Sequence, residues 1–470
     1  MSCSGAVTVG LDIGTTSVKA AAFDDNGTVL ARARIPHRVL APAPELLEHD
    51  AERAWRRGPR RALAALGAPG AEARAVAVAS MVPSLTAVDR RGRPLSPGLL
   101  YGDARGRTES VTVAGGAGEL VEFLRWSAAH APEAAGYWPA PAVANMALGG
   151  RAVVDIGVAF SSIPLYGADG WDQQVCSDCG VSPDQLPAVE MFGTPVGQVG
   201  RDGPLLATGS VDVFCEQMTA GADQEGDMHV LCGTTLLPWV VTSTWKDVPG
   251  LWTMPHPSPG LFMIGGASNA GGLFLDWVRE LLGRPRGNQV VDPRRVPVWV
   301  PYLRGERTPY QDPDRRGALA AIDLTHGPAA LQRAAWEASA FVARHHLELS
   351  GIPGRRIVAT GGGTRVPGWM QALADVTNLP VHVAAVPEGA AQGAAFLARV
   401  AAGLEESEKD ARRWARTERV VEPDPAWTGP ADDRYQLFLE LSDSGTVAGT
   451  RALRTTPATD GGEPDRALSG

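Results

Sequence analysis

The sequence predicts an α/β protein of two domains, and three observations point to this fold class. At 470 residues, the chain exceeds what one hydrophobic core usually supports, which makes two domains the natural expectation. A strand, a Gly-Thr-Thr turn and a second strand occur twice, once near the start of each half. Runs with strand periodicity are also mixed with runs of helical composition in both halves.

The first half opens on a strand pair and continues with strands and helices. Alternating or continuous apolar runs predict its strands, at 7–11, 18–23, 29–35, 75–79 and 85–88. Helices are expected at 50–66 and 119–126. The stretch 167–187 is rich in aspartate and turn formers, and we expect it to be irregular.

The second half repeats the opening pattern. Its strands are predicted at 228–232, 236–241, 356–360 and 381–384. Its helices are predicted at 328–349, 369–377 and 390–402; the first is rich in alanine, and the last is expected to be the final helix. We therefore expect domains at 1–225 and 226–445. Residues 446–470 lack periodicity and are expected to form a disordered tail.

Composition excludes several classes of protein. The formal charge of −9 is spread along the chain without a basic block, which argues against a nucleic-acid partner. Five cysteines at irregular spacing do not suggest a disulfide framework, and the single Cys-x-x-Cys at 176–179 favours two reduced thiols over a zinc site. No signal peptide or apolar run of membrane-spanning length is visible, so we expect a cytoplasmic protein without a membrane partner.

The turn Asp-Ile-Gly-Thr-Thr at 12–16 is the most informative segment. Its glycine lets the backbone approach a ligand, its N–H groups can form an anion-binding nest, and its hydroxyls can donate to phosphate oxygens. The Asp12 carboxylate is the kind of oxygen ligand that Mg²⁺ prefers. The same residues also suit an ordinary β-hairpin, so the turn by itself leaves both interpretations open.

Three further segments supply partners for this turn. A second Gly-Thr-Thr turn at 233–235 could hold the phosphates from the side opposite the first turn. Such a clasp suits phosphoryl transfer, which depends on positioning and charge neutralisation. Three glycines at 361–363, between a strand and a helix, favour contact with a nucleotide over a flexible loop. Asp212, between the two halves, is a candidate general base, although its spacing alone favours an ordinary helix N-cap.

The order and spacing of these motifs resemble the FGGY family of carbohydrate kinases, whose fold belongs to the actin-like ATPases. The resemblance runs from about residue 7 to about residue 441. It rests on the two Gly-Thr-Thr turns and on the segments at 48–55, 101–105, 209–221, 268–271, 301–317, 361–375 and 388–395. It implies two actin-like (ribonuclease H-like) domains, each a mixed sheet with helices on both faces, with a cleft between them.

The resemblance also implies the chemistry of the site. Asp212 would take the proton of a hydroxyl on a small sugar, polyol or cyclitol, ATP would be the phosphoryl donor, and Asp12 would hold Mg²⁺. The residues expected on the ATP side are Thr15, Thr16, Lys19, Gly233, Thr234, Thr235, Gly361, Gly362, Gly363 and Gln371. Those expected to contact the substrate are Met81, Ser84, Asp103, Arg105 and Asp212. A homodimer is a further expectation, because dimers are frequent in the family.

The chain departs from the family where the sugar would bind. Residues 80–84 read Ser-Met-Val-Pro-Ser, which is less polar than the family's Gln-Met-His-Gly, and the region between 107 and 137 is shorter. This predicts a less common polyol, a modified sugar or a cyclitol as substrate. The alternatives are an ordinary pentulose kinase, similar to xylulokinase or ribulokinase, and an actin-like ATP-binding regulator without kinase activity. Only the kinases need a base at Asp212.

Overall fold

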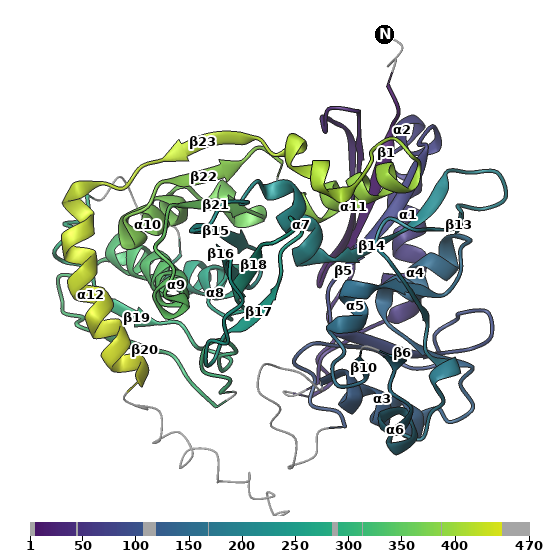
Figure 1. Cartoon of the computed structure of the whole chain (residues 1–470). Helices are drawn as coiled ribbons and strands as arrows, with labels where there is room; N and C mark the ends of the chain where they lie inside the picture. Colours follow the sequence, from purple (N-terminus) through teal and green to yellow (C-terminus); the bar gives the residue numbers. More distant parts are fainter. Residues whose placement is uncertain are drawn as a thin grey trace, which may run out of the picture.

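A computed structural model of the chain describes residues 5–443 apart from 44–45, 107–118, 168, 284–289, 313 and 387. Two large mixed sheets organise the described residues, one in each half (Figure 1). The first sheet has the strand order β13 (Pro195–Gln198), β14 (Leu205–Val211), β5 (Ala75–Ser80), β1 (Thr8–Ile13), β2 (Ser17–Phe23) and β3 (Val29–Pro36). The α/β class and the mixed character of the sheets are thereby confirmed.

The second large sheet repeats the pairing pattern of the central strands of the first. Its strand order is β17 (Trp252–Pro255), β18 (Phe262–Gly265), β16 (Leu236–Thr242), β15 (Asp227–Cys232), β21 (Arg356–Thr360), β22 (Val381–Ala384) and β23 (Thr417–Val421). Strand β1 pairs antiparallel with β2 and parallel with β5, and β15 pairs in the same two ways with β16 and β21. Each Gly-Thr-Thr turn therefore joins an antiparallel strand pair at the middle of its sheet.

Smaller strands and irregular helices complete the two halves. The short strands are β4 (Glu48–His49), β6 (Ser84–Val88), β7 (Gly98–Leu100), β8 (Gly136–Trp138), β9 (Val153–Asp155), β10 (Tyr166–Gly167), β11 (Gly170–Trp171), β12 (Ala188–Glu190), β19 (Val298–Val300) and β20 (Ala318–Ala320). The 3-10 turns are Pro183–Gln185, Gly362–Arg365 and Glu408–Trp414, and a π-helical turn covers Glu52–Arg57. Strands β4, β7, β6 and β8 form one small sheet in the first half.

Helices cover both faces of the first sheet. The helices of the chain are α1 (Gly58–Ala64), α2 (Ala68–Ala71), α3 (Glu119–His130), α4 (Ala140–Leu148), α5 (Ile156–Phe160), α6 (Gln173–Asp178), α7 (Asp212–Ala220), α8 (Gly272–Leu282), α9 (Pro328–Ser350), α10 (Pro367–Thr377), α11 (Gly389–Ala401) and α12 (Pro425–Asp443). Because side chains alternate along a strand, Val9 and Leu11 of β1 pack toward α1 and α4, while Gly10 faces α11.

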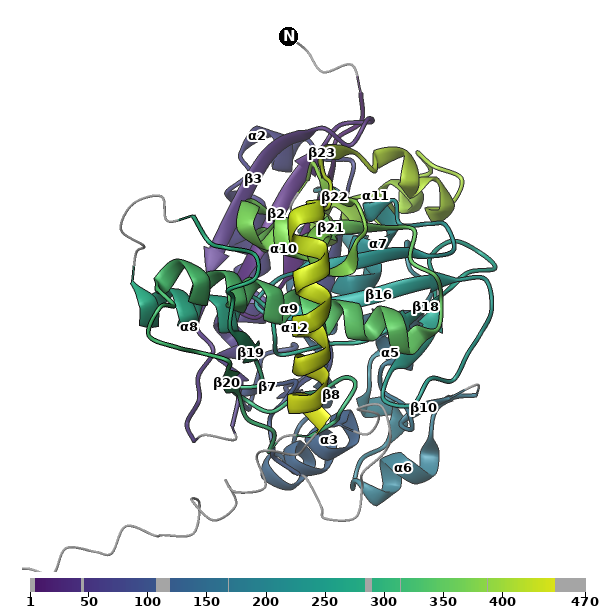
Figure 2. The same ribbon diagram turned by 90° about the vertical axis from the view of Figure 1, so that its left-hand side faces the viewer.

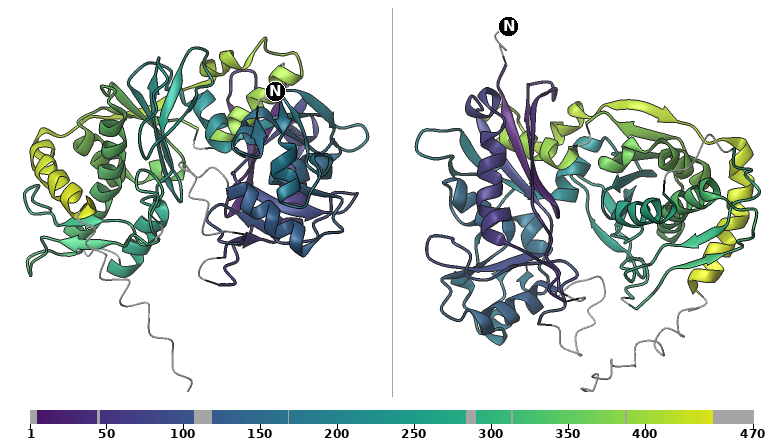
Figure 3. Two further views of the ribbon diagram at one scale, coloured as in Figure 1. Left: turned by 60° about the horizontal axis from the view of Figure 1, so that its bottom comes forward. Right: turned by 180° about the vertical axis from the view of Figure 1, so that it is seen from behind.

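Helix α11 comes from the second half of the sequence but packs on the first sheet. The approach is close, since a Cβ on Gly10 would lie 1.7 Å from the carbonyl oxygen of Ala391. Alanines of α11 and residues of β5 and α7 belong to the same hydrophobic cluster. Figure 1 shows α7 and α11 between the two sheets. Figure 3 shows from two further directions that the two halves are joined near these helices. The domain division at 225 and 226 stays a prediction.

Two elements at the end of the described chain differ from expectation. Strand β23 and helix α12 follow α11, so α11 is not the final helix. Gly429 and Pro430 interrupt helical propensity inside α12, but Tyr435 and Phe438 anchor it in the core with α9. Figure 2 shows α12 crossing the outer side of the second half. Tertiary packing here overrides local preference.

Other expected elements are confirmed with shifted bounds. The helix expected at 50–66 is a π-helical turn followed by α1. The stretch 167–187 is not wholly irregular, because Asp172 caps the short helix α6, where Cys176 is buried as a free thiol with Cys179 just beyond. The predicted tail at 446–470 lies outside the described residues. Within the described ranges, no helix has both the length and the apolar character needed to cross a bilayer.

Candidate active site

An ion pair joins β1 and β2 next to the turn, with Asp12 buried and Lys19 partly exposed. Asp12 and Lys19 are register partners on the two antiparallel strands, so their side chains leave the same face of the sheet. Lys19 Nζ lies 3.0 Å from Asp12 Oδ2. Asp12 Oδ1 is buried without a hydrogen-bond partner among the described residues. This arrangement leaves one carboxylate oxygen of Asp12 available to a ligand.

Two acidic side chains on α7 interact electrostatically with the Asp12–Lys19 ion pair. Asp212 is the first residue of α7, and Glu216 follows one helical turn later on the same face. Burial, together with the negative charge of Asp12, raises the pKa of Asp212 to about 7, although the Val213 N–H and Lys19 oppose the shift. Burial likewise raises the pKa of Glu216 to about 8. The positive charge of Lys19 is therefore set among three carboxyl groups: Asp12, Asp212 and Glu216.

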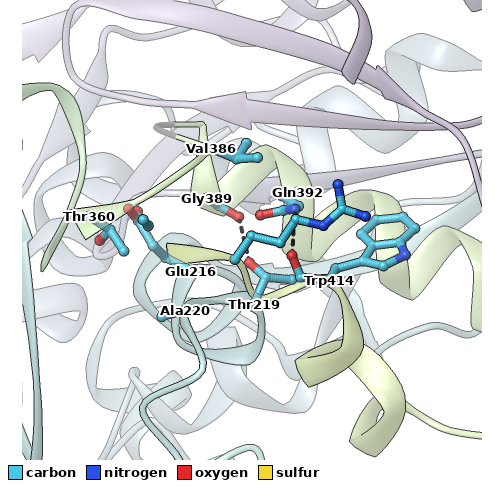
Figure 4. A pocket seen from close by; sticks show the side chains of 10 residues that line it. Glu216, Thr219, Ala220, Thr360, Val386, Gly389, Gln392 and Trp414 are labelled. Carbon is cyan, nitrogen blue, oxygen red and sulfur yellow. Dashed lines mark hydrogen bonds between the residues drawn. The ribbon is translucent and has the colours of Figure 1, made fainter. Parts of the chain in front are cut away.

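Glu216 also lines a pocket where α7, the end of β21 and the start of α11 meet. The pocket residues include Glu216, Thr219, Thr360, Gly389, Gln392 and Trp414. Figure 4 shows Glu216 beside Thr360 at one end, with Gln392 and Trp414 at the other. The Thr360 hydroxyl lies 2.8 Å from Nε2 of the buried His229, and a hydrogen bond with Thr360 opposes the rise in the pKa of Glu216. Through Glu216, the pocket adjoins the group of carboxyls formed by Asp12, Asp212 and Glu216. Thr360, Gly389 and Gln392, which also line it, belong to the second half of the chain.

Two histidines hold the backbone of the first Gly-Thr-Thr turn. His37 Nε2 donates to the carbonyl oxygen of Gly14 at 3.0 Å, and His49 Nε2 donates to that of Thr15 at 2.7 Å. Trp55 Nε1 donates to His49 Nδ1 at 3.0 Å, which fixes the neutral tautomer of His49. The sequence reasoning missed His37 entirely, because nothing in its local pattern distinguishes it.

The hydroxyls of the same turn differ in their surroundings. Thr15 Oγ1 lies 2.6 Å from the hydroxyl of Tyr101, which follows β7, whereas Thr16 is exposed. Tyr101 was noted in the sequence only as part of a motif, and its contact with Thr15 depends on the packing of the small sheet against the first turn. The turn therefore has one hydroxyl already oriented by a partner and one facing solvent.

In both Gly-Thr-Thr turns the glycine N–H closes the turn by donating to a backbone carbonyl oxygen, three residues ahead in the first turn and two residues ahead in the second. Gly14 N–H donates to Ser17 O at 3.1 Å, and Gly233 N–H donates to Thr235 O at 3.0 Å. The start of α8 is bonded to the second turn, since Gly272 N–H donates to Gly233 O. Thr234 is exposed. Both turns thus present threonine hydroxyls from rigid backbone.

The three glycines after β21 have different reasons to be glycine. Gly361 has φ of +85°, which favours glycine, and a Cβ on Gly363 would lie 2.2 Å from the ring of Trp369. Only at Gly362 would a Cβ meet nothing within 4 Å. Of the three, Gly362 therefore has open space beside its backbone. Gln371 Nε2 already donates to Asp375 Oδ1 at 2.8 Å and to Glu422 O at 3.0 Å.

Several polar residues expected on the substrate side are already bonded within the protein. Asp103 and Arg105 form a bidentate ion pair, and Arg105 also pairs with Glu48 Oε2 at 2.7 Å. Asp103 is fully buried and also accepts from the Leu47 N–H at 2.6 Å. Ser84 Oγ accepts from the Ala140 N–H at 3.1 Å. These polar groups therefore have partners within the protein.

Met81 is placed differently, at the end of β5. Its N–H donates to Ile13 O at 3.2 Å, which fixes the segment after β5 next to the first turn. The Met81 side chain is buried, and so is Ser80, whose hydroxyl has no partner among the described residues. The region between 107 and 118 lies outside the described residues.

His49 leads to a prediction about stability. Burial lowers the pKa of His49 to about 4, so between pH 6.5 and 4 the unfolded chain binds a proton that the folded chain does not. The free energy of unfolding must therefore fall as the pH falls through this window. His49→Gln keeps a donor for Thr15 O and an acceptor for Trp55 but removes the titration. We expect the loss of stability between pH 7 and pH 5 to be smaller by about 2 kcal/mol in this variant.

Chemical denaturation at the two pH values measures this difference. His130→Gln, at an exposed histidine of α3, is the matched control and should lose as much stability as the wild type. Equal losses in the wild type and His49→Gln would show that the titration of His49 does not contribute to acid instability.

Comparison with known proteins completes the description of the site. The N-terminal domain model of the FGGY family of carbohydrate kinases matches residues 7–114, and the C-terminal domain model matches residues 228–402. A xylulose kinase of Escherichia coli K12 is 26% identical over 441 residues, covering 85% of this chain and 91% of that protein. A gluconokinase of Bacillus subtilis 168 is 25% identical, covering 84% and 87%. The structure of a xylulose kinase from Rhodospirillum rubrum is 28% identical, with a TM-score of 0.77 and coverage of 93% and 99%.

Proposed function

Because the chain belongs to the FGGY family of carbohydrate kinases, and is accordingly an ATP-dependent kinase of a sugar or polyol, we propose that Asp212 is its general base. The observation that carries this proposal is the position of Asp212. It begins α7 beside the Asp12–Lys19 ion pair, where its pKa is raised to about 7. A base with a pKa near the working pH is suited to proton transfer.

The proposed reaction is a direct phosphoryl transfer. The oxygen of the acceptor hydroxyl forms a bond to the γ-phosphorus of ATP, and the bond from that phosphorus to the oxygen bridging to ADP breaks. The electron pair leaves with ADP. The carboxylate of Asp212 accepts the proton of the hydroxyl as the new bond forms. The same residue binds the acceptor through that proton before transfer.

Magnesium fits the residues around the first turn. Asp12 Oδ1 is a buried oxygen without a partner among the described residues, and oxygen is the ligand type that Mg²⁺ prefers. We propose that Asp12 holds the ion, which when bound neutralises charge on the phosphates. Lys19, held by Asp12 Oδ2, keeps the turn near neutral charge before the nucleotide arrives.

The phosphates of ATP are proposed to lie between the two Gly-Thr-Thr turns. Thr15, Thr16, Gly233, Thr234 and Thr235 would bind them, because each turn combines a closed backbone with threonine hydroxyls. Gly361, Gly362 and Gly363 are proposed for the adenosine side, with Gly362 in direct contact because of its open space. Gln371 would contribute through its side-chain oxygen, since its nitrogen already has two acceptors.

The acceptor is proposed to be a polyol, a modified sugar or a cyclitol. Met81 and Ser84 make this segment less polar than the family pattern, and the Asp103–Arg105 pair has its polar groups bonded within the protein. In this proposal Asp103 and Arg105 shape the wall of the acceptor site. A pentulose kinase is the second candidate, because several of the similar proteins are xylulose kinases.

A screen of polyols, ketoses, aldonates and cyclitols, read as ADP release, separates the two candidates. We expect selective turnover of a less common polyol, a modified sugar or a cyclitol. Strong and selective turnover of D-xylulose, D-ribulose or glycerol would contradict this substrate class and favour an ordinary kinase of the family. ADP release that is equal with and without every acceptor would contradict the kinase itself.

A further inference from the structure

Arg307 carries an unused hydrogen-bonding edge in the interior of the protein. It lies in the loop after β19, in the second half of the chain. Its Nε and Nη2 are both buried, and neither has a hydrogen-bond partner among the described residues. These two nitrogens form one side of the planar guanidinium and together can bind two oxygens of one anion. A buried charged donor without a partner is costly, so this edge requires an explanation.

Other arginines of the chain show what normally fills this edge. In Arg105, Arg356 and Arg434 the same two nitrogens donate to both oxygens of one carboxylate. Their partners are Asp103, Asp227 and Glu337, at distances between 2.6 Å and 3.0 Å. The free edge of Arg307 is therefore shaped for an anion with two oxygens that comes from outside the described chain.

The backbone beneath Arg307 is held rigidly. The buried Glu306 accepts from Ser268 Oγ at 2.6 Å, from the Asn269 N–H at 3.0 Å and from the Arg307 N–H at 2.6 Å. Thr308 Oγ1 donates to Ala267 O at 3.1 Å and lies 2.9 Å from His346 Nε2. The hydrogen bonds of Glu306 and Thr308, the chain neighbours of Arg307, thus hold the backbone from which the Arg307 side chain extends.

Arg307 reaches the first half of the molecule. Its guanidinium carbon lies 5.5 Å from the centre of the Tyr101 ring, within the range of a cation–π contact. The Tyr101 hydroxyl is in turn 2.6 Å from Thr15 Oγ1 in the first Gly-Thr-Thr turn. Arg307, Tyr101 and Thr15 therefore form one chain of contacts that leads from the second half to the turn proposed to bind phosphate.

We propose that the free edge of Arg307 binds an oxyanion next to Thr15, and that this oxyanion is the phosphoryl group during transfer. This inference rests on the proposed function. A guanidinium placed there neutralises charge on the phosphoryl oxygens, which is the main requirement of phosphoryl transfer. Because the arginine comes from the second half and its contacts from the first, it binds fully only when the two halves are correctly positioned.

A carboxylate of an acidic acceptor has the same chemistry and is the other possible source of the anion. The contact of Tyr101 with Thr15 favours the phosphoryl group, because that turn is proposed to hold phosphates whatever the acceptor is. The two sources differ in which acceptors are affected. A phosphoryl ligand makes Arg307 necessary for neutral and acidic acceptors alike, whereas a carboxylate ligand makes it necessary for acidic acceptors only.

Binding of inorganic phosphate in the presence of MgADP tests the site without a known acceptor. We expect calorimetry to show phosphate binding to the wild type and at least tenfold weaker binding to Arg307→Gln. Arg304→Gln, at an exposed arginine of the same loop, is the matched control and should bind as the wild type does. The midpoint of thermal unfolding should change little in Arg307→Gln, because its Nε and Nη2 make no bond within the described protein and only the contact with the Tyr101 ring is lost.

Phosphate affinity equal in Arg307→Gln and the wild type, or no phosphate binding to the wild type, would overturn the proposal. A fall in thermal stability with unchanged phosphate affinity would show a structural role instead. If no acceptor is turned over by the wild type, the proposed function fails, but this binding experiment still decides on Arg307.

Turnover kinetics distinguish the two sources of the anion. With each acceptor that the wild type uses, Arg307→Gln should lower kcat by about 10²- to 10³-fold and leave the KM of the acceptor nearly unchanged. Arg307→Lys keeps the charge but loses the two-pronged edge, so its kcat should be intermediate. An increase in KM confined to aldonates, with neutral polyols unaffected, would overturn the assignment to the phosphoryl group.

Discussion

Replacing Asp212 with asparagine is expected to slow phosphoryl transfer by about 10²- to 10⁴-fold, the usual contribution of a general base. Asparagine has nearly the same shape but cannot accept the proton of the attacking hydroxyl. ATP binding should be retained, because the proposed phosphate contacts lie on the two Gly-Thr-Thr turns and not on α7. Acceptor-dependent ADP release measures the rate, and calorimetric titration with MgATP measures the binding.

Asp202→Asn is the matched control for this substitution. Asp202 is exposed in the turn before β14, so the same chemical change there should leave the rate within about twofold of the wild type. A wild-type rate in Asp212→Asn would remove Asp212 from the mechanism. Loss of MgATP binding in that variant would show that Asp212 organises the nucleotide site instead.

The pH dependence of the wild type gives a second measure of the same base. Asp212 must be ionised to accept a proton, and its pKa is raised to about 7 by burial and by Asp12. As the pH falls below about 7, the protonated fraction grows, and kcat/KM should fall about tenfold for each further pH unit. A rate that stays constant down to pH 5 would contradict a base with this raised pKa.

The second large effect is expected from Gly393→Ala, where α11 crosses α7. A Cβ at Gly393 would lie 1.9 Å from the carbonyl oxygen of Cys215, which is backbone and cannot turn away. The two helices must therefore move apart, at a cost of about 1 to 3 kcal/mol in the free energy of unfolding. Because α7 carries both Asp212 and Glu216, the same movement should also reduce the rate of turnover by at least tenfold.

Gly429→Ala provides the matched control, since it makes the same change at a helical glycine of α12. A Cβ there would meet nothing within 4 Å, and alanine has the higher helix propensity, so stability should be unchanged or rise by up to about 1 kcal/mol. Urea denaturation and acceptor-dependent ADP release measure the two effects. Wild-type stability in Gly393→Ala would mean that the helices can separate without cost.

The fold class and the central strands of both large sheets could be predicted from the sequence. Strand β22 lies at the predicted bounds, and the two Gly-Thr-Thr turns join antiparallel strands as predicted. These features are local, because alternation of apolar residues and turn chemistry are written into neighbouring positions. Helix α12 was missed because its glycine and proline weaken the local signal, while the contacts of Tyr435 and Phe438 that stabilise it come from distant residues.

How the candidate residues group in space depends on the tertiary structure. Asp12, Lys19, Asp212 and Glu216 share one electrostatic environment, whereas Asp103 and Arg105 are paired with each other. The raised pKa of Asp212, the support of the first turn by His37 and the free edge of Arg307 have no signal in the sequence. The physical reason is that burial, charge interactions and hydrogen bonds act through space between segments far apart in the chain. The sequence therefore predicted a phosphate-binding turn, and the fold determined which charges surround it.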